Sequence, residues 1–96
     1  MGIRELLKEK RAEILRISAQ YGARNIRVFG SVVRGEAGDD SDIDFLVTFD
    51  KSSSLMDHAG LLVELEKLLG RKIDVAPDDC LKPRIKNRVL REAVPI

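Results

Sequence analysis

The feature of this sequence that most constrains the fold is residues 42–49, where two acidic residues alternate with apolar ones ahead of a hydrophobic run. Because successive side chains of a β-strand point to opposite faces, Asp42 and Asp44 project from one face, roughly 6.5 Å apart by strand rise. The other face receives the apolar residues Ile43, Phe45, Val47 and Phe49. The pattern predicts a strand with one face in a hydrophobic core and a pair of carboxylates on the other.

Two carboxylates on one face repel each other unless a proton, solvent or a bound cation relieves the repulsion. Mg²⁺ suits a site made of oxygen ligands and leaves coordination positions for substrate phosphates. Upstream, Gly30 allows the backbone to approach a ligand closely, and Ser31 adds a hydroxyl beside backbone amides that can bind an anion. A metal on one side and a phosphate on the other predict phosphoryl or nucleotidyl transfer.

Other interpretations of the acidic pair compete with this one. Taken alone, Asp42 and Asp44 fit an acidic, solvated loop end. With Asp40 they mimic the opening of an EF-hand calcium loop, but that loop needs Gly next and Glu at its end, where this chain has Phe45 and Lys51. The sequence also has no Walker phosphate-binding motif and no dinucleotide-binding glycine motif, so both of those sites are excluded.

The remaining chain alternates helical and strand patterns. Helices are predicted at residues 3–20, 31–34 and 55–69, and from Pro83 until Pro95 stops the last one. Ser53 or Ser54 caps the third helix, whose apolar stripe runs from Leu55 through 62 and 63 to 69. Strands are predicted at residues 25–29, 42–49 and 72–76. This order predicts a single α/β domain, residues 1–96, with a small three-stranded sheet.

Two further polar residues are candidates for the same site. Asp74 alternates with two β-branched residues in the third predicted strand, so its carboxylate must point away from the apolar face. It is either a satisfied structural acid or a third member of the acidic site. Arg34, one turn beyond the Gly-Ser corner, either contacts phosphate or pairs with Glu36 or Asp39. His58 lies in mid-helix without a ligand-like neighbour and is interpreted as a surface or partly buried residue.

Composition limits the remaining classes of function. The 17 basic and 16 acidic residues give a net charge of +1, which provides no reason to expect direct nucleic-acid binding. No apolar run approaches the roughly 18 residues of a membrane span, so a cytoplasmic protein without membrane contact is expected. Cys80 is the single cysteine and forms no internal disulfide or zinc site. The last helix presents either a solvated or a partner-binding basic face, at Lys82, Arg84, Lys86, Arg88 and Arg91.

The motif Gly30-Ser31, ten intervening residues and then Asp42-Ile43-Asp44 resembles the signature of the DNA polymerase beta-like nucleotidyltransferase superfamily. The fuller string, Gly-Ser-x-x-Arg-Gly followed by Ser-Asp-Ile-Asp, is similar to its minimal, single-domain branch, which includes antitoxins paired with HEPN-domain toxins. The resemblance implies a polymerase beta palm-like fold, with a mixed three-stranded sheet flanked by about four helices. It also implies that the second and third strands are neighbours, which would bring Asp74 to the acidic pair.

From the residues and the resemblance together we expect a nucleotidyltransferase that moves AMP from ATP to a hydroxyl group. The expected catalytic residues, which also bind two Mg²⁺ ions, are Asp42, Asp44 and Asp74. The expected phosphate-binding residues are Gly30, Ser31 and Arg34. The resemblance implies that the acceptor is a tyrosine of a cognate HEPN toxin, which makes the chain an antitoxin. A small-molecule acceptor, a non-catalytic antitoxin that only binds its partner, and the oligomeric state are left open.

Overall fold

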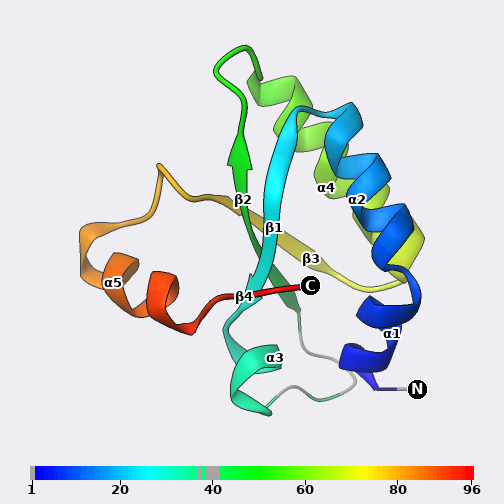
Figure 1. Ribbon diagram of the computed structural model, residues 1–96, viewed down its shortest axis with the longest axis vertical. Coiled ribbons are helices and arrows are strands. Elements are labelled where there is room, and N and C mark those ends of the chain that lie inside the picture. Colours follow the sequence, from blue (N-terminus) through cyan, green and yellow to red (C-terminus); the bar gives the residue numbers. More distant parts are fainter. Residues whose placement is uncertain (1, 37, 39–41) are drawn as a thin grey trace.

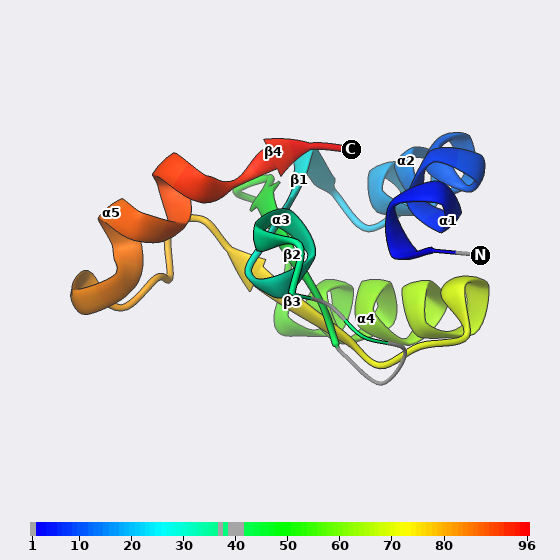
Figure 2. The same ribbon diagram turned by 90° about the horizontal axis from the view of Figure 1, so that it is seen from below.

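The structure, a computed structural model, describes residues 2–36, 38 and 42–96. Five helices and four strands lie in those residues. In chain order they are α1 (Ile3–Glu9), α2 (Arg11–Gln20), β1 (Ala23–Phe29), α3 (Ser31–Arg34), β2 (Ile43–Phe49), α4 (Leu55–Leu69), β3 (Ile73–Pro77), α5 (Pro83–Glu92) and β4 (Val94–Pro95). Figures 1 and 2 both place α5 away from the group formed by α1, α2 and α4, with the sheet between them.

The sheet is mixed, with strand order β3-β2-β1-β4. β1 runs antiparallel to both of its neighbours, whereas β2 and β3 run parallel through the crossover helix α4. The predicted α/β class, the mixed sheet and the side-by-side placement of β2 and β3 are therefore confirmed. The sheet has four strands rather than the predicted three.

The fourth strand comes from the segment after α5. This helix was predicted to continue until Pro95, but it ends at Glu92, and Pro95 instead pairs with Arg27 at the edge of the sheet. Steric contact with the proline ring disfavours helical backbone at the residue before it, which here is Val94. Because an edge strand can tolerate the missing N–H of proline, this short extended segment can join β1.

Two helices differ in detail from the prediction. The first predicted helix is divided at Lys10, where φ −96° and ψ 7° leave the helical region. The division falls in a polar run with no apolar residue to anchor one continuous helix. In α4 the buried residues are Leu61, Leu65 and Leu69, whereas Leu55 is 82% exposed. A leucine-rich helix carries more than one plausible apolar stripe, and packing against the sheet selects between them.

The termini of α4 agree with the prediction. Ser54 caps the helix: its hydroxyl accepts the Asp57 N–H at 3.3 Å, and its own N–H donates to the Asp57 carboxylate at 2.8 Å. Gly70 ends the helix in the left-handed region, with φ 64°. This capping box matches the reciprocal pattern that favours helix initiation at Ser or Thr.

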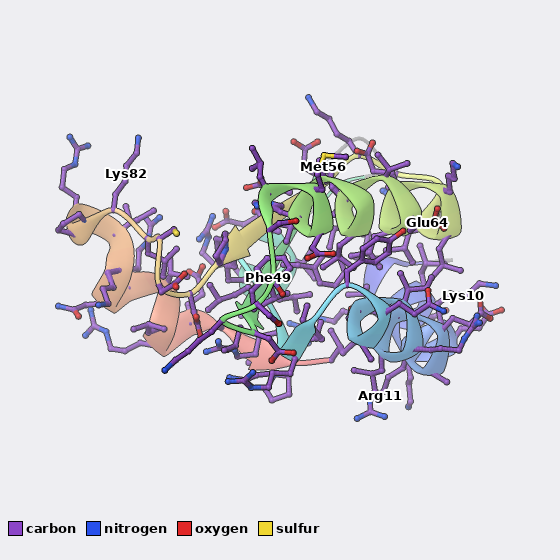
Figure 3. All side chains as sticks on the ribbon, turned by 90° about the horizontal axis from the view of Figure 1, so that it is seen from above. Lys10, Arg11, Phe49, Met56, Glu64 and Lys82 are labelled. Atoms are coloured by element: carbon purple, nitrogen blue, oxygen red, sulfur yellow. The ribbon has the colours of Figure 1, made fainter. Side chains whose placement is uncertain are left out.

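The two faces of the sheet have different roles. One face packs against α1, α2 and α4, and Ile14, Ile43, Phe45 and Leu61 there are fully buried. The other face carries Asp44, which is half-buried, and Leu46, which is fully buried, and Val89 is the buried residue of α5. Figure 3 shows Lys82 at the α5 end of the molecule and Lys10 and Arg11 at the opposite end. In the described ranges, no helix is both long and apolar enough to cross a bilayer.

Candidate active site

Strand register brings two of the predicted acidic residues together. In the parallel pair of β2 and β3, Asp44 is the register partner of Asp74, and the flanking pair is Ile43 with Ile73. The isoleucines are buried in the core, so the two aspartates project from the opposite face. Asp44 is half-buried, whereas Asp42 and Asp74 are exposed. The sheet therefore lines up a carboxylate row that opens to solvent.

The carboxylates influence one another electrostatically. Burial raises the pKa of Asp44 above its ordinary value, and the negative charges of Asp74 and Asp42 raise the pKa further. The guanidinium of Arg34 acts in the opposite direction. An ionised carboxylate in this position is disfavoured unless a cation compensates it, which is the condition expected of a metal ligand.

The Gly30 corner lies directly against Asp44. Phe29, the last residue of β1, is the register partner of Asp44, so the chain turns at Gly30 beside this carboxylate. Gly30 has φ 77° and ψ −144°, a region that residues with a Cβ rarely adopt. A Cβ at Gly30 would also collide with Asp44 Oδ2. The backbone conformation therefore favours glycine here, and a Cβ would have to displace the Asp44 carboxylate.

Helix α3 begins at this corner and offers unused hydrogen-bond donors. Gly30 O accepts the N–H groups of Val33 and Arg34, each at 3.1 Å. The N–H groups of Ser31 and Val32 have no hydrogen-bond partner among the residues that the structure describes. Together with the Ser31 hydroxyl, these amides can bind an anion beside the carboxylate row.

Arg34 forms two ion pairs, one predicted and one not. Its Nε lies 3.3 Å from Glu36 and its Nη1 lies 2.9 Å from Glu92. Asp39, the other predicted partner, and Ser41 of the motif lie outside the described residues. Glu92 also accepts the Gly30 N–H at 2.7 Å, so it joins the corner to the end of α5.

Sequence reasoning missed Glu92, although a signal was present. Glu92 lies on the face of α5 that also carries Ile85 and Val89, because these positions are separated by four and three residues. An acidic residue on the inward face of an otherwise basic helix needs a polar partner, just as Asp74 does on its strand. The same reasoning applied to α5 would have identified it.

The donor set fits a magnesium ion, although it is not a preassembled cage. Among the described residues, no group of three or more His, Cys, Asp or Glu side chains is arranged to hold a metal ion. Mg²⁺ commonly binds through one or two carboxylates and completes its coordination with water and substrate phosphates. Asp44 and Asp74 provide carboxylate oxygens on the face of the sheet away from the core, and Asp42 immediately precedes β2. One or two carboxylates of this kind match that mode of binding.

Of the remaining polar candidates, His58 contacts the backbone of β3, whereas Cys80 and the basic positions near α5 are exposed. His58 is partly buried, as predicted, and its Nε2 lies 2.8 Å from Val75 O. Its ring lies 5.5 Å from the ring of Phe49, measured between centroids. Cys80 is exposed and makes no disulfide. All five basic positions of the α5 region are exposed, which agrees with both interpretations of that surface.

Sequence comparison identifies the class of protein. Residues 5–96 match the family model described as a nucleotidyltransferase domain. The chain is 38% identical over 90 residues to a Methanocaldococcus jannaschii protein described as a candidate protein adenylyltransferase, covering 94% of this chain and 97% of that protein. It is 48% identical over 75 residues to the protein adenylyltransferase MntA of Thermococcus cleftensis, covering 78% and 76% of the two chains.

Solved structures agree with the sequence matches. A structure described as a candidate minimal nucleotidyltransferase has a TM-score of 0.86 at 48% identity, covering 96% of this chain and 94% of that chain. A toxin-antitoxin crystal structure with AMP-PNP has a TM-score of 0.74 at 19% identity, covering 88% and 69%, which is a likeness of fold. The chain belongs to the nucleotidyltransferase domain family and is an enzyme of that class, as predicted. Within this family it is related to the minimal nucleotidyltransferases and to MntA.

Proposed function

We propose that this protein transfers AMP from ATP to a hydroxyl group of a partner protein, with Mg²⁺ as the metal. The observation that carries the proposal is that Asp44 is the register partner of Asp74 and that its side chain lies against Gly30. In the proposed reaction the acceptor oxygen bonds to the α-phosphorus, the bond from that phosphorus to the bridging oxygen breaks, and pyrophosphate leaves. The proton of the hydroxyl passes to a carboxylate of the site.

Each candidate residue has a role that follows from its place. The hydroxyl of Ser31 and the amides of Ser31 and Val32, which have no partner in the described part of the chain, hold the β- and γ-phosphates, and Arg34 adds a positive charge beside them. Asp42, Asp44 and Asp74 would hold Mg²⁺, and the resemblance implies two ions. The metal would supply positive charge that neutralises the reacting phosphate. In this proposal Asp74, which is exposed, also accepts the proton of the acceptor hydroxyl.

The proposed acceptor is a tyrosine on a HEPN-domain partner, with this chain acting as the antitoxin. Two observations support a protein acceptor. The relatives from M. jannaschii and T. cleftensis are described as protein adenylyltransferases. Asp74 is exposed on the face of the sheet away from the core, so an acceptor group carried by a macromolecule can reach it from solvent.

The test is transfer of label from ATP marked at the α-phosphate, with Mg²⁺, into a co-expressed HEPN-domain protein. The comparison variant carries Asp42→Asn and Asp44→Asn, which remove two proposed metal ligands at nearly constant side-chain volume. We expect the wild type to label the partner on tyrosine and the double variant to lose more than about 100-fold of this activity.

Two results would redirect the proposal. Label that appears on a small hydroxyl compound but not on protein would identify a small-molecule acceptor. Partner silencing that persists in the double variant, with no label on the partner, would show an antitoxin that acts by binding alone.

A further inference from the structure

Glu92 connects the phosphate-binding corner to α5. One carboxylate oxygen, Oε2, accepts the Gly30 N–H at 2.7 Å, and the other, Oε1, lies 2.9 Å from Arg34 Nη1. These two partners are the first residue of the corner and the last residue of α3. We propose that Glu92 is a positioning residue for the nucleotide, which fixes the Gly30 turn and the Arg34 guanidinium in the geometry that receives the triphosphate. This inference rests on the proposed function.

The bonds to Glu92 have the character of structural contacts. The Glu92 side chain is only 13% exposed, and both distances are in the range of charge-assisted hydrogen bonds. Although burial raises the pKa of Glu92, the Gly30 N–H and the Arg34 guanidinium outweigh that effect and lower the pKa. Glu92 is therefore held in its charged form by the groups that it orients.

Helix α3 needs such external ties because it is only four residues long. A helix of this length is not stable by itself, since forming its first turn orders several residues in exchange for a single hydrogen bond. At its far end, the Arg4 guanidinium donates to Val33 O at 3.1 Å. Glu92 supplies the tie at the Gly30 end. The corner that meets phosphate is thus fixed by side chains from α1 and α5.

The opposite hypothesis is that Glu92 competes with the triphosphate for the same donors. The donor inventory argues against it. Arg34 has five N–H donors, and its Nη2 makes no hydrogen bond within the described part of the chain. The amides of Ser31 and Val32 are likewise unpartnered there. A triphosphate therefore finds donors at the corner while Glu92 keeps its own bonds.

The two hypotheses predict opposite effects of Glu92→Gln. This variant keeps the size of the side chain but removes its charge, and its amide oxygen can accept only one of the two present bonds strongly. If Glu92 positions the corner, ATP affinity falls by roughly 10-fold or more, the range known for outer-shell partners. Glu92→Ala falls further. If repulsion between Glu92 and the triphosphate dominates, both variants bind ATP more tightly than the wild type.

The experiment is calorimetric titration of the whole protein with ATP and Mg²⁺, together with KM and kcat for AMP transfer. The matched control is Glu64→Gln, because Glu64 lies on α4, on the other side of the molecule from Lys82 and α5 (Figure 3). Unfolding lowers the concentration of active enzyme and hence the apparent kcat without changing KM. A rise in KM for ATP is therefore the readout that a merely structural role would not produce. The backbone amide of Gly30 is followed by NMR hydrogen exchange in parallel.

Support for the inference is weaker ATP binding in the order wild type, Glu92→Gln, Glu92→Ala, with faster exchange at Gly30 and an unchanged Glu64→Gln control. In an Arg34→Met background, Glu92→Gln should have a smaller effect, because one of its two targets is gone. Equal or tighter ATP binding by Glu92→Gln would overturn the inference and leave the proposed function intact. Absence of ATP binding by the wild type would overturn both.

Discussion

Replacement of Gly30 by alanine tests the corner most sharply. Gly30 has φ 77° and ψ −144°, and an alanine held in such a region costs about 1–3 kcal/mol. The added Cβ would also collide with Asp44 Oδ2, and Asp44 Cγ would lie 3.4 Å away. The carboxylate must therefore leave its place, so the variant combines a moderate loss of stability with a displaced site residue.

These two effects can be separated by their magnitudes. A domain of this kind has a free energy of unfolding of about 5–15 kcal/mol. Losing even 3 kcal/mol from the lower limit leaves about 2 kcal/mol, so roughly 97% of the molecules stay folded. Unfolding then explains almost none of any loss of activity. A displacement of the carboxylate by about 1 Å can by itself cost on the order of 100-fold in transfer.

The matched control is Gly70→Ala. Gly70 also has positive φ, 64°, and a Cβ there meets nothing within 4 Å. Its expected cost is about 1–2 kcal/mol from backbone conformation alone. Urea unfolding followed by circular dichroism gives both stabilities, and label transfer from ATP gives both activities. We expect Gly30→Ala to lose about 100-fold and Gly70→Ala to stay near the wild type. Equal activity of the two folded variants would refute the role assigned to the corner.

Three other predictions concern charge. Asp44→Asn should raise the free energy of unfolding of the metal-free protein at neutral pH by roughly 0.2–1 kcal/mol, because like charges directly opposite each other in a sheet destabilise it. Since the folded pKa of Asp44 is raised, this gain should shrink as the pH falls through that pKa and vanish well below about pH 4, where the carboxylate is protonated in both states. Mg²⁺ should raise the melting temperature of the wild type by mass action, and Asp44→Asn should reduce this shift; equal shifts would argue against a metal site at Asp44. Charge reversal at Arg84 and Lys86 should raise KM for a protein acceptor and leave ATP binding unchanged, whereas an unchanged KM would indicate a merely solvated face.

The strand pattern carried most of what the sequence could predict. Alternation in residues 42–49 correctly assigned Ile43 and Phe45 to the core and Asp44 to the other face. The β-branched neighbours of Asp74 placed it on the matching face of β3. Because side chains alternate between the two faces of a strand, burial of one face determines which residues lie on the other. The sequence was therefore sufficient to predict the faces on which Asp44 and Asp74 lie.

Other features depend on tertiary contacts that a local pattern does not contain. The two residues of β4 form a strand only because β1 presents an open edge to them. The break at Lys10 leaves both α1 and α2 helical, so helix propensity gives no warning of it. The contacts of Glu92 join segments 62 residues apart at Gly30. Long-range pairings of this kind follow from the assembled fold.

The central claim is that the site formed by the carboxylate row and the Gly30 corner catalyses transfer of a nucleotide rather than of a phosphate. The most direct measurement uses two preparations of ATP, one labelled at the α-phosphate and one at the γ-phosphate, with Mg²⁺ and the partner protein. Nucleotidyl transfer predicts that α-label appears on the partner, that γ-label is released in pyrophosphate, and that Asp44→Asn abolishes both events. Appearance of γ-label on the partner, or α-label transfer that survives Asp44→Asn, would contradict the account.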